Sequence, residues 1–203
     1  MKETKIQLSQ AEMELMCNAE IILTKNKVME KAKLLLEDIQ TEMTGYIKQN
    51  TALAENHFFQ NSPKISRGEN YLGLPYLILD YPRKFEQESI AAIRTMFWWG
   101  HFFSITLHLT GSARILLQRK IGDHYTVLAN SNYYIGINKD PWMHHFEKDN
   151  YSRLDQMTEE AFRQQCKEAM HLKIACKIPL HAWETAPDVL WNEWKWLVHN
   201  CLG

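Results

Sequence analysis

The sequence has no excess of charge of either sign. Its 23 Lys and Arg residues are balanced by 24 Asp and Glu residues, which leaves a formal net charge of −1 with neutral histidines. A chain with so little net charge generates no overall field that attracts nucleic acid or anionic lipid. Because the sequence also has no basic stripe, we expect no nucleic acid and no membrane among its partners.

A long apolar run is also missing. No segment reaches the roughly 18 uninterrupted apolar residues that a membrane-spanning helix needs. The first residues, MKETKIQLSQAEMEL, contain no apolar stretch of the signal-peptide type. These two absences predict a soluble, cytoplasmic protein.

Cysteine is scarce, and no two cysteines form a CxxC motif of the metal-binding or redox type. We predict that they are reduced thiols in the core, since a buried free cysteine behaves as a small hydrophobic residue. A reactive cysteine is the alternative, and it would need an electropositive, partly exposed setting. The four cysteines are Cys17, Cys166, Cys176 and Cys201.

Local catalytic signatures are absent as well. The chain has no GxSxG, P-loop, GxGxxG or kinase-type motif, and no carboxylate pair is framed for glycoside chemistry. The absence lowers the expectation of an enzyme without removing it, because catalytic residues scattered along a chain leave no local motif. The sequence predicts no particular cofactor.

The sequence does contain enough apolar material for one core, with 45% hydrophobic residues in 203. This length is typical of a single domain, here 1–203. Periodicity divides the chain into a helical segment at 1–54, an antiparallel sheet at 70–147 and C-terminal helices at 157–203. We therefore predict an α+β fold with about five to seven strands in a meander and helices packed on the sheet.

The helical segments carry two candidate interaction surfaces. Ser9 and Glu12 form a capping-box pattern, and residues 24–26 mark a position where the long helical stretch could break. The Met-rich stripe that follows suits a core-facing side, or an adaptable interface with a protein partner or in a homodimer. Near the C-terminus, Trp196 lies off the apolar stripe of its helix and is the second candidate surface.

Seven segments read as strands, at YLGLPYLILDY, SIAAIRTMFWW, FFSITLHLT, ARILLQRKI, HYTVLAN, YYIGI and WMHHF. Pro75 in the first segment favours an edge or a bulge, because proline cannot donate to a ladder. ARILLQRKI equally fits a helical turn. LKIACKIPL, in the C-terminal region, alternates with period two and leaves the end of its helix ambiguous.

The sequence TMFWWGHFFSITLHLTG predicts a hairpin with a two-residue turn at Gly100 and His101. Its register places Ile93 opposite His108 and divides the side chains between two faces. One face is apolar except for Arg94, and the other is aromatic near the turn and polar below it. Arg94 and His108 are therefore expected on opposite faces.

Arg94 needs an acceptor, because a guanidinium group stays charged when it is buried. The simpler partner is Asp80 or a helix glutamate in an ion pair, and such a closed pair would remove Arg94 as a ligand anchor. The alternative is an anionic ligand group, which suits the planar fork of arginine. The ligand-binding candidates are Arg94, His108, Trp99, Thr106 and Arg67.

A metal site is a further hypothesis. His145 and Glu147 share one face if WMHHFEKD is a strand, and with His108 they would form two imidazoles and a carboxylate suited to iron or zinc. The spacing does not match the helical HExxH motif.

Three functions remain open on the sequence. The first is a binding protein that holds a small, partly apolar ligand in a cavity between sheet and helices. An anionic group on this ligand is one option. The second is a metal-assisted enzyme that uses the histidine and carboxylate cluster. The third is a protein interaction module that acts through the Met-rich helices or an exposed Trp.

Overall fold

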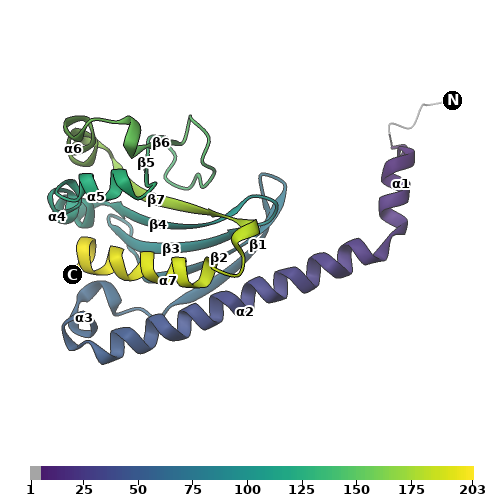
Figure 1. Ribbon diagram of the computed structural model, residues 1–203, viewed down its shortest axis with the longest axis horizontal. Helices are drawn as coiled ribbons and strands as arrows, with labels where there is room; N and C mark the ends of the chain where they lie inside the picture. Colours follow the sequence, from purple (N-terminus) through teal and green to yellow (C-terminus); the bar gives the residue numbers. More distant parts are fainter. Residues whose placement is uncertain (1–5) are drawn as a thin grey trace.

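The structure is a computed structural model that describes residues 6–203, so residues 1–5 at the start of the predicted helical segment lie outside the described part. A seven-stranded sheet with the order β1-β2-β3-β4-β7-β5-β6 forms its centre. Figure 1 shows the long N-terminal helix and the C-terminal helix on one face of this sheet. The predicted α+β class, with an antiparallel sheet and helices packed on it, is confirmed.

The helices and strands have the following bounds. The α-helices are α1 (Gln10–Cys17), α2 (Ala19–Gln49), α3 (Thr51–Glu55), α4 (Gly111–Gly122), α5 (Tyr125–Asn130), α6 (Glu159–Glu168) and α7 (Ala186–Leu197). The strands are β1 (Lys64–Tyr71), β2 (Leu74–Phe85), β3 (Ile90–Trp98), β4 (Phe102–Thr110), β5 (Tyr134–Gly136), β6 (Tyr151–Arg153) and β7 (His171–Pro179). Short 3₁₀ turns lie at His57–Phe59, Leu154–Gln156 and Leu180–Ala182, and a π-helical turn, Val198–Leu202, follows α7.

The main hydrophobic cluster fills the space between the sheet and the helices. From α7, the buried Trp194 donates its indole N–H to the carbonyl oxygen of Tyr81 on β2 at 2.6 Å, so its polar atom has an acceptor. A ligand cavity between sheet and helices would occupy space that these side chains already fill. The buried residues of α2 recur at helical spacing and are Met29, Ala32, Leu36, Ile39, Met43 and Ile47.

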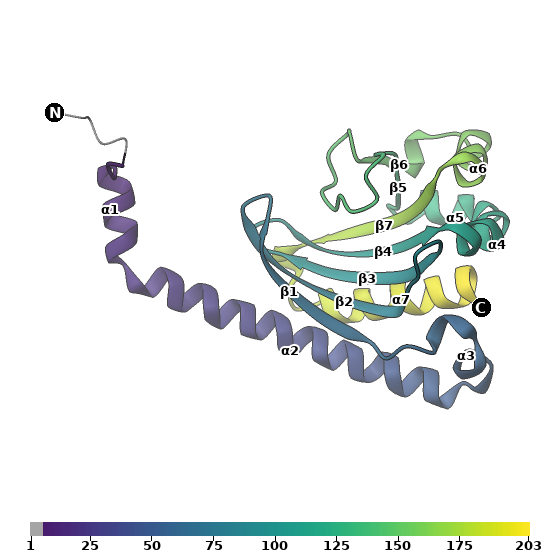
Figure 2. The same cartoon turned by 180° about the vertical axis from the view of Figure 1, so that it is seen from behind.

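The N-terminal helical segment breaks at Asn18, and not at residues 24–26. Ser9 and Glu12 form the predicted capping box at the start of α1. The side chain of Asn18 accepts the backbone N–H of Glu20 and so caps the start of α2. Both α1 and the first part of α2 project beyond the sheet (Figures 1 and 2).

Two of the predicted strands are helices. ARILLQRKI lies in α4 and HYTVLAN lies in α5. In α4 the buried residues Ala113, Leu117 and Ile121 recur every four residues, which is the helical alternative that the sequence left open. WMHHF forms no strand and lies in an irregular loop, residues 137–150, that joins β5 to β6.

The sheet also extends beyond 70–147. It begins at Lys64, before the predicted start at residue 70, and LKIACKIPL, which the sequence leaves ambiguous, forms β7 between the C-terminal helices. β7 pairs with β4 and β5, so the last strand in the chain is internal to the sheet. Pro75 lies where the register between β1 and β2 shifts, in agreement with the predicted bulge.

The turn between β3 and β4 is one residue longer than predicted. Trp98 pairs with Phe102, and residues 99–101 form the connection. The backbone N–H of His101 donates to the carbonyl oxygen of Trp98 at 3.1 Å. Gly100 adopts a φ of 75°, a left-handed conformation that glycine adopts without a steric penalty.

This longer turn changes which side chains share a face. Ile93 pairs with Leu107, and Arg94 pairs with Thr106, so the predicted pairing of Ile93 with His108 is wrong. A one-residue change of register moves every side chain of one strand to the other face. Arg94 and His108 therefore lie on the same face of the sheet, opposite the main hydrophobic cluster.

Candidate functional site

The sheet face opposite the helices carries polar residues on adjacent strands. Asp80 on β2, Arg94 on β3 and Thr106 on β4 form one cross-strand row. In the next row, His108 on β4 pairs directly with Lys173 on β7. We call these five residues the polar cluster. Asp80, Thr106, His108 and Lys173 are buried, and the Arg94 side chain is 14% exposed.

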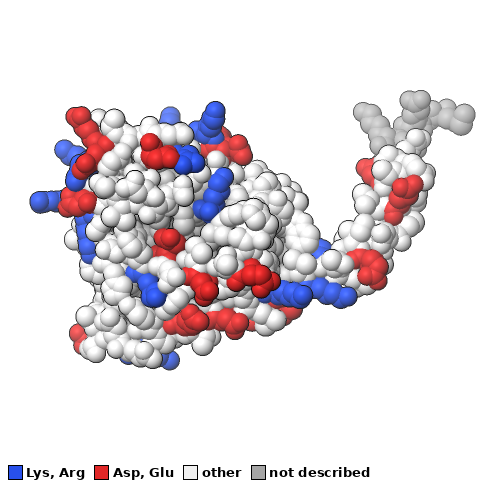
Figure 3. All heavy atoms as spheres, viewed as in Figure 1, with Lys and Arg blue, Asp and Glu red and all other residues white. Residues whose placement is uncertain are grey.

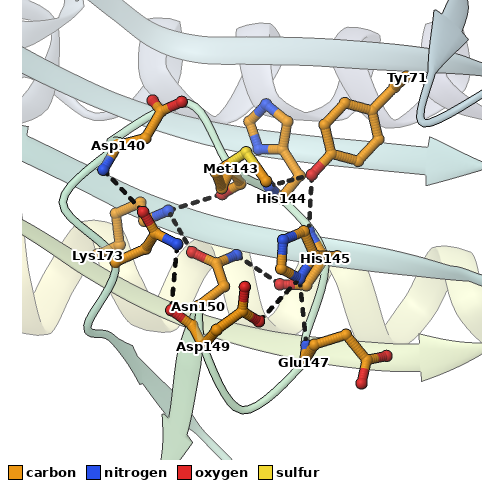
Figure 4. Close-up of polar contacts among 10 residues, drawn as sticks. Tyr71, Asp140, Met143, His144, His145, Glu147, Asp149, Asn150 and Lys173 are labelled. Carbon is orange, nitrogen blue, oxygen red and sulfur yellow. Dashed lines mark hydrogen bonds and ion pairs between the residues drawn. The ribbon is translucent and has the colours of Figure 1, made fainter.

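The loop of residues 137–150 covers the polar cluster. The ring of Trp142 lies 5.2 Å from the His108 ring and 5.4 Å from the Arg94 guanidinium carbon. The hydroxyl oxygen of Tyr71, on β1, accepts the backbone N–H groups of His144 at 2.6 Å and His145 at 3.0 Å. Figure 4 shows this loop held from one side by Tyr71 and from the other by Lys173.

Arg94 is in a closed ion pair. Its Nε lies 2.8 Å from Oδ1 of Asp80, and its Nη2 lies 3.3 Å from Oδ2. Burial raises the pKa of the Asp80 carboxyl, and the charge of Arg94 offsets part of that effect. The simpler prediction for Arg94, a structural ion pair with Asp80, therefore describes this residue. Because its guanidinium group is already paired with a carboxylate, Arg94 is not free to anchor a ligand, as the sequence predicts for a closed ion pair.

Lys173 is a buried ammonium group without a carboxylate partner. It is 1% exposed, and no carboxylate oxygen of residues 6–203 lies within 4.0 Å of its Nζ. Nζ donates to the carbonyl oxygen of Met143 at 2.7 Å and to Oδ1 of Asn150 at 3.5 Å, and it lies 4.9 Å from the ring centre of Tyr151. Burial lowers the pKa of Lys173 to about 8.

Gly136 of β5 makes room for the Lys173 side chain. A Cβ atom at position 136 would lie 2.9 Å from Cε of Lys173, closer than real contacts of this type. Close approach of a neighbouring side chain is one reason for glycine inside a strand. The absence of a side chain at position 136 therefore leaves the space that the Lys173 side chain occupies.

His108 has an unsatisfied polar atom. The residue is 1% exposed, and its Nε2 has no hydrogen-bond partner among the described residues. Burial, together with the positive charges of Arg94 and Lys173, lowers the pKa of His108 to about 3. The same three causes, burial first, lower the pKa of His144 to about 3. Both imidazoles are therefore neutral at neutral pH.

The predicted metal donors do not come together. His108 lies on β4, whereas His145 and Glu147 lie in the loop because WMHHF is not a strand. Nδ1 of His145 accepts the backbone N–H of Glu147 at 3.4 Å, and Figure 4 shows the Glu147 carboxylate pointing away from that ring. Within residues 6–203, no group of three or more His, Cys, Asp or Glu side chains is arranged to hold a metal ion.

The remaining ligand-binding candidates divide between several places. Thr106 lies in the polar cluster with Arg94 and His108. Trp99 packs against the main hydrophobic cluster, on the helix side of the sheet. Arg67 is exposed on β1, where its Nε lies 2.7 Å from a carboxylate oxygen of Glu69. Neither of the last two therefore belongs to the site that the other three share.

Lys173 was missed from the sequence, although a signal for it existed. In LKIACKIPL the residues Leu172 and Ile174 alternate with Lys173, so a strand places the lysine on the face opposite its apolar neighbours. The ambiguity between helix and strand hid this alternation. The convergence with His108 depends on the pairing of β4 with β7, which no local pattern specifies.

An open cavity of about 490 Å³ lies on the same sheet face, nearer the β3–β4 turn. Trp98, Phe102 and Phe146 are among its lining residues, together with Lys177. The indole N–H of Trp98 is buried with no acceptor among the described residues. No member of the polar cluster lines this cavity, although His145, Phe146, Glu147 and Asp149 of the loop do.

The candidate interaction surfaces differ in exposure. Trp196 is partly buried against the main hydrophobic cluster, with its ring 5.5 Å from His124 and 6.0 Å from Tyr133, so it is a partly shielded surface residue and not a fully exposed one. Met13 and Met16 of α1 are exposed, whereas Met29 and Met43 are buried against the sheet.

Similarity to known proteins gives no family for this chain. Among residues 6–203, no helix combines the length and the apolar character that crossing a membrane requires. Comparisons with protein-family models, with curated proteins and with solved structures returned no match to this chain.

Proposed function

We propose that the protein binds a small organic monocarboxylate beneath the loop of residues 137–150. The observation that carries this proposal is the pair His108 and Lys173, in which a buried ammonium group without a carboxylate partner lies opposite a buried imidazole with an unsatisfied nitrogen. A buried charge and a buried unpaired polar atom are each costly, and a ligand that pairs with both removes the two costs together.

Charge indicates a monoanion. Arg94 and Lys173 contribute two positive charges, Asp80 contributes one negative charge, and His108 contributes none, so the five residues of the polar cluster carry a net charge of +1, and the Asp140 carboxylate of the loop acts on Lys173 from outside the cluster. One carboxylate balances this charge inside a poorly solvated site, whereas a phosphate dianion overcompensates it. Lys173 would donate to the carboxylate, and the Asp80 pair keeps Arg94 in place beside it.

The walls of the site suit an apolar or aromatic ligand body. The rings of Trp142 and Phe85 lie 5.4 and 5.6 Å from the Arg94 guanidinium carbon, and their own centres are 6.2 Å apart. Trp142 also contacts the His108 ring. Aromatic walls with a few convergent polar groups are typical of small-molecule sites.

Entry of the ligand requires the loop to move, because the polar cluster is closed. The polar contacts that hold the loop to the sheet include those of Tyr71 with two loop amides and those of Lys173 with the Met143 carbonyl and the Asn150 side chain. Exchange of the Met143 carbonyl for a ligand carboxylate would replace a neutral acceptor with a charged one, which forms the stronger hydrogen bond with an ammonium group.

Calorimetric titration with benzoate tests the proposal, with benzyl alcohol as the uncharged analogue. We expect the wild type to bind benzoate and not benzyl alcohol. Lys173→Met should bind benzoate at least about tenfold more weakly, because loss of one charge-assisted hydrogen bond costs roughly 1.5–3 kcal/mol. Lys148→Met is the matched control, since Lys148 is an exposed lysine of the same loop.

Two results would contradict the proposal. One is the absence of benzoate binding to the wild type at concentrations on the order of 10 mM. The other is equal binding by the wild type and a folded Lys173→Met variant. A thermal melt of each variant establishes folding, and methionine retains the apolar stem of the lysine, so we expect Lys173→Met to melt no lower than a few degrees below the wild type.

A further inference from the structure

The N-terminal arm, defined as residues 6–24, is exposed along its whole length. It comprises α1 and the start of α2, and Figures 1 and 2 show it projecting away from the rest of the molecule. Monomeric proteins rarely expose so many neighbouring apolar side chains, and such a surface marks an interaction site. Its large exposed apolar residues are Ile6, Leu8, Met13, Leu15, Met16, Ile21, Ile22 and Leu23.

The apolar stripe of α2 continues from the body into the arm. Met29, Leu36 and Met43 follow one another at intervals of seven residues and are buried against the body. Ile22 precedes Met29 by the same interval and is 59% exposed. The body ends close to Lys25, whose Nζ lies 2.7 Å from Glu69 on β1, so Ile22 has no described part of its own chain to pack against.

The charge along the arm and the adjoining turns of α2 is divided into two blocks. Residues 6–24 contain Glu12, Glu14 and Glu20 and no Lys or Arg, whereas residues 25–33 contain four lysines and one glutamate. Figure 3 shows acidic atoms along the outer arm and basic atoms where α2 meets the body. Lys27 and Lys31 have no carboxylate oxygen within 4.0 Å among residues 6–203.

We propose that two copies of the chain form a dimer by packing their arms antiparallel. In this arrangement the acidic block of each arm lies beside the basic block, residues 25–33, of the other copy, whereas parallel packing would place like charges together. A two-fold axis near Leu23 brings Glu20 of one copy opposite Lys27 of the other. Ile21 and Ile22 of both copies then lie close to this axis, within the interface. One self-complementary patch thus serves both copies, as a two-fold interface requires.

The acidic character of the arm argues against a lipid surface as its occupant. An anionic membrane attracts basic amphipathic helices, and this arm carries three carboxylates and no basic side chain. Charge also gives the dimer a defined salt response, since screening weakens the attraction between exposed charge blocks. We expect tighter dimerisation at low ionic strength.

Sedimentation velocity of the full chain over a concentration series tests the dimer. We expect a reversible dimer in the wild type, and about a tenfold or larger weakening in Ile22→Glu, because a charge at the centre of an interface removes a major contact. Ile22 is exposed in the monomer, so this change should leave folding intact. Leu116→Glu, at an equally exposed apolar residue of α4, is the matched control and should dimerise as the wild type does.

A charge-swap pair distinguishes self-association from other occupants. We expect a variant with Glu12, Glu14 and Glu20 all changed to Lys to be monomeric, and a variant with Lys27 and Lys31 changed to Glu to be monomeric. An equimolar mixture of the two should form a heterodimer, because opposite blocks then face each other. A wild type that is monomeric throughout, a dimer unaffected by Ile22→Glu, or a mixture that stays monomeric would overturn the proposal, as would vesicle binding by a monomer.

Discussion

Lys173 is the residue on which the proposed function depends. Burial of an ammonium group without a carboxylate partner is unfavourable, and the acceptors present, a carbonyl and an amide oxygen, are neutral. A purely structural role would be filled as well by an apolar side chain of similar volume. A bound anion would explain why this position, opposite the unsatisfied His108, carries a charged side chain.

The lowered pKa of Lys173 predicts a pH-dependent stability. Its pKa is about 8 in the folded protein and 10.5 in its ordinary state, so between these values the unfolded chain holds a proton that the folded chain lacks. Stability therefore increases with pH across this window. Relative to Lys173→Met, we expect the unfolding free energy of the wild type to rise by about 1 to 2 kcal/mol between pH 8 and pH 9.5.

Urea denaturation at several pH values measures this difference. The comparison with Lys173→Met cancels the contributions of the other titrating groups, and Lys148→Met provides the control in which no difference should develop. Parallel stability profiles for the wild type and Lys173→Met would show that Lys173 titrates normally in the folded protein. That result would contradict the lowered pKa of Lys173 on which this prediction depends.

At the scale of elements, the loop of residues 137–150 lies over the polar cluster and would control access to the proposed site. Tyr71→Phe removes the hydroxyl oxygen that accepts two loop amides, so we expect the loop to open more often. Loss of these hydrogen bonds costs on the order of 1–2 kcal/mol, which corresponds to about a tenfold faster hydrogen exchange of the His144 and His145 amides. Hydrogen exchange of the peptide that covers the loop measures the effect.

Tyr76→Phe is the matched control for this prediction. Tyr76 lies on β2 beside Tyr71, with ring centres 6.1 Å apart, and its hydroxyl holds no loop amide. Exchange rates that are equal in Tyr71→Phe and Tyr76→Phe would mean that the Tyr71 hydroxyl does not hold the loop closed.

The sequence predicts correctly those elements whose residue pattern fits only a helix or only a strand. The capping box of Ser9 is present, and the predicted C-terminal helices are present as α6 and α7. Short apolar runs such as ARILLQRKI fit both periods, and their packing partners decide between them. The sequence of β7 is ambiguous in the same way, since its strand form depends on pairing with β4 and β5.

The site was predictable only in part. Arg94 is predicted to need an acceptor, and Asp80, one of the partners named for it, is that acceptor. His108 is predicted only as a candidate ligand-binding and metal-binding residue. The common face of Arg94 and His108 was not predicted, because a hairpin turn with one additional residue reverses the facing of a whole strand. The loop over the cluster could not be predicted either, since an irregular segment has no periodicity to read.

At the scale of the whole molecule, the two proposals concern separate parts of the chain. The polar cluster lies within the sheet domain, and the arm projects beyond it (Figure 1). An antiparallel dimer of arms would keep the two sheet domains apart and leave both clusters accessible to ligand. Ligand binding and dimerisation should therefore vary independently, so Lys173→Met should dimerise as the wild type does, and Ile22→Glu should bind benzoate as the wild type does.

The most direct test of the anion site is the ¹⁵N resonance of the His108 ring during a benzoate titration. Comparison with His108→Gln assigns the resonance. If a carboxylate binds beside Lys173 and His108, the His108 ring resonances shift saturably in the wild type. The same shift in Lys173→Met should need at least about tenfold more benzoate, and benzyl alcohol should cause none. Ring resonances that stay unchanged while benzoate binds would place the ligand elsewhere and contradict the proposed site.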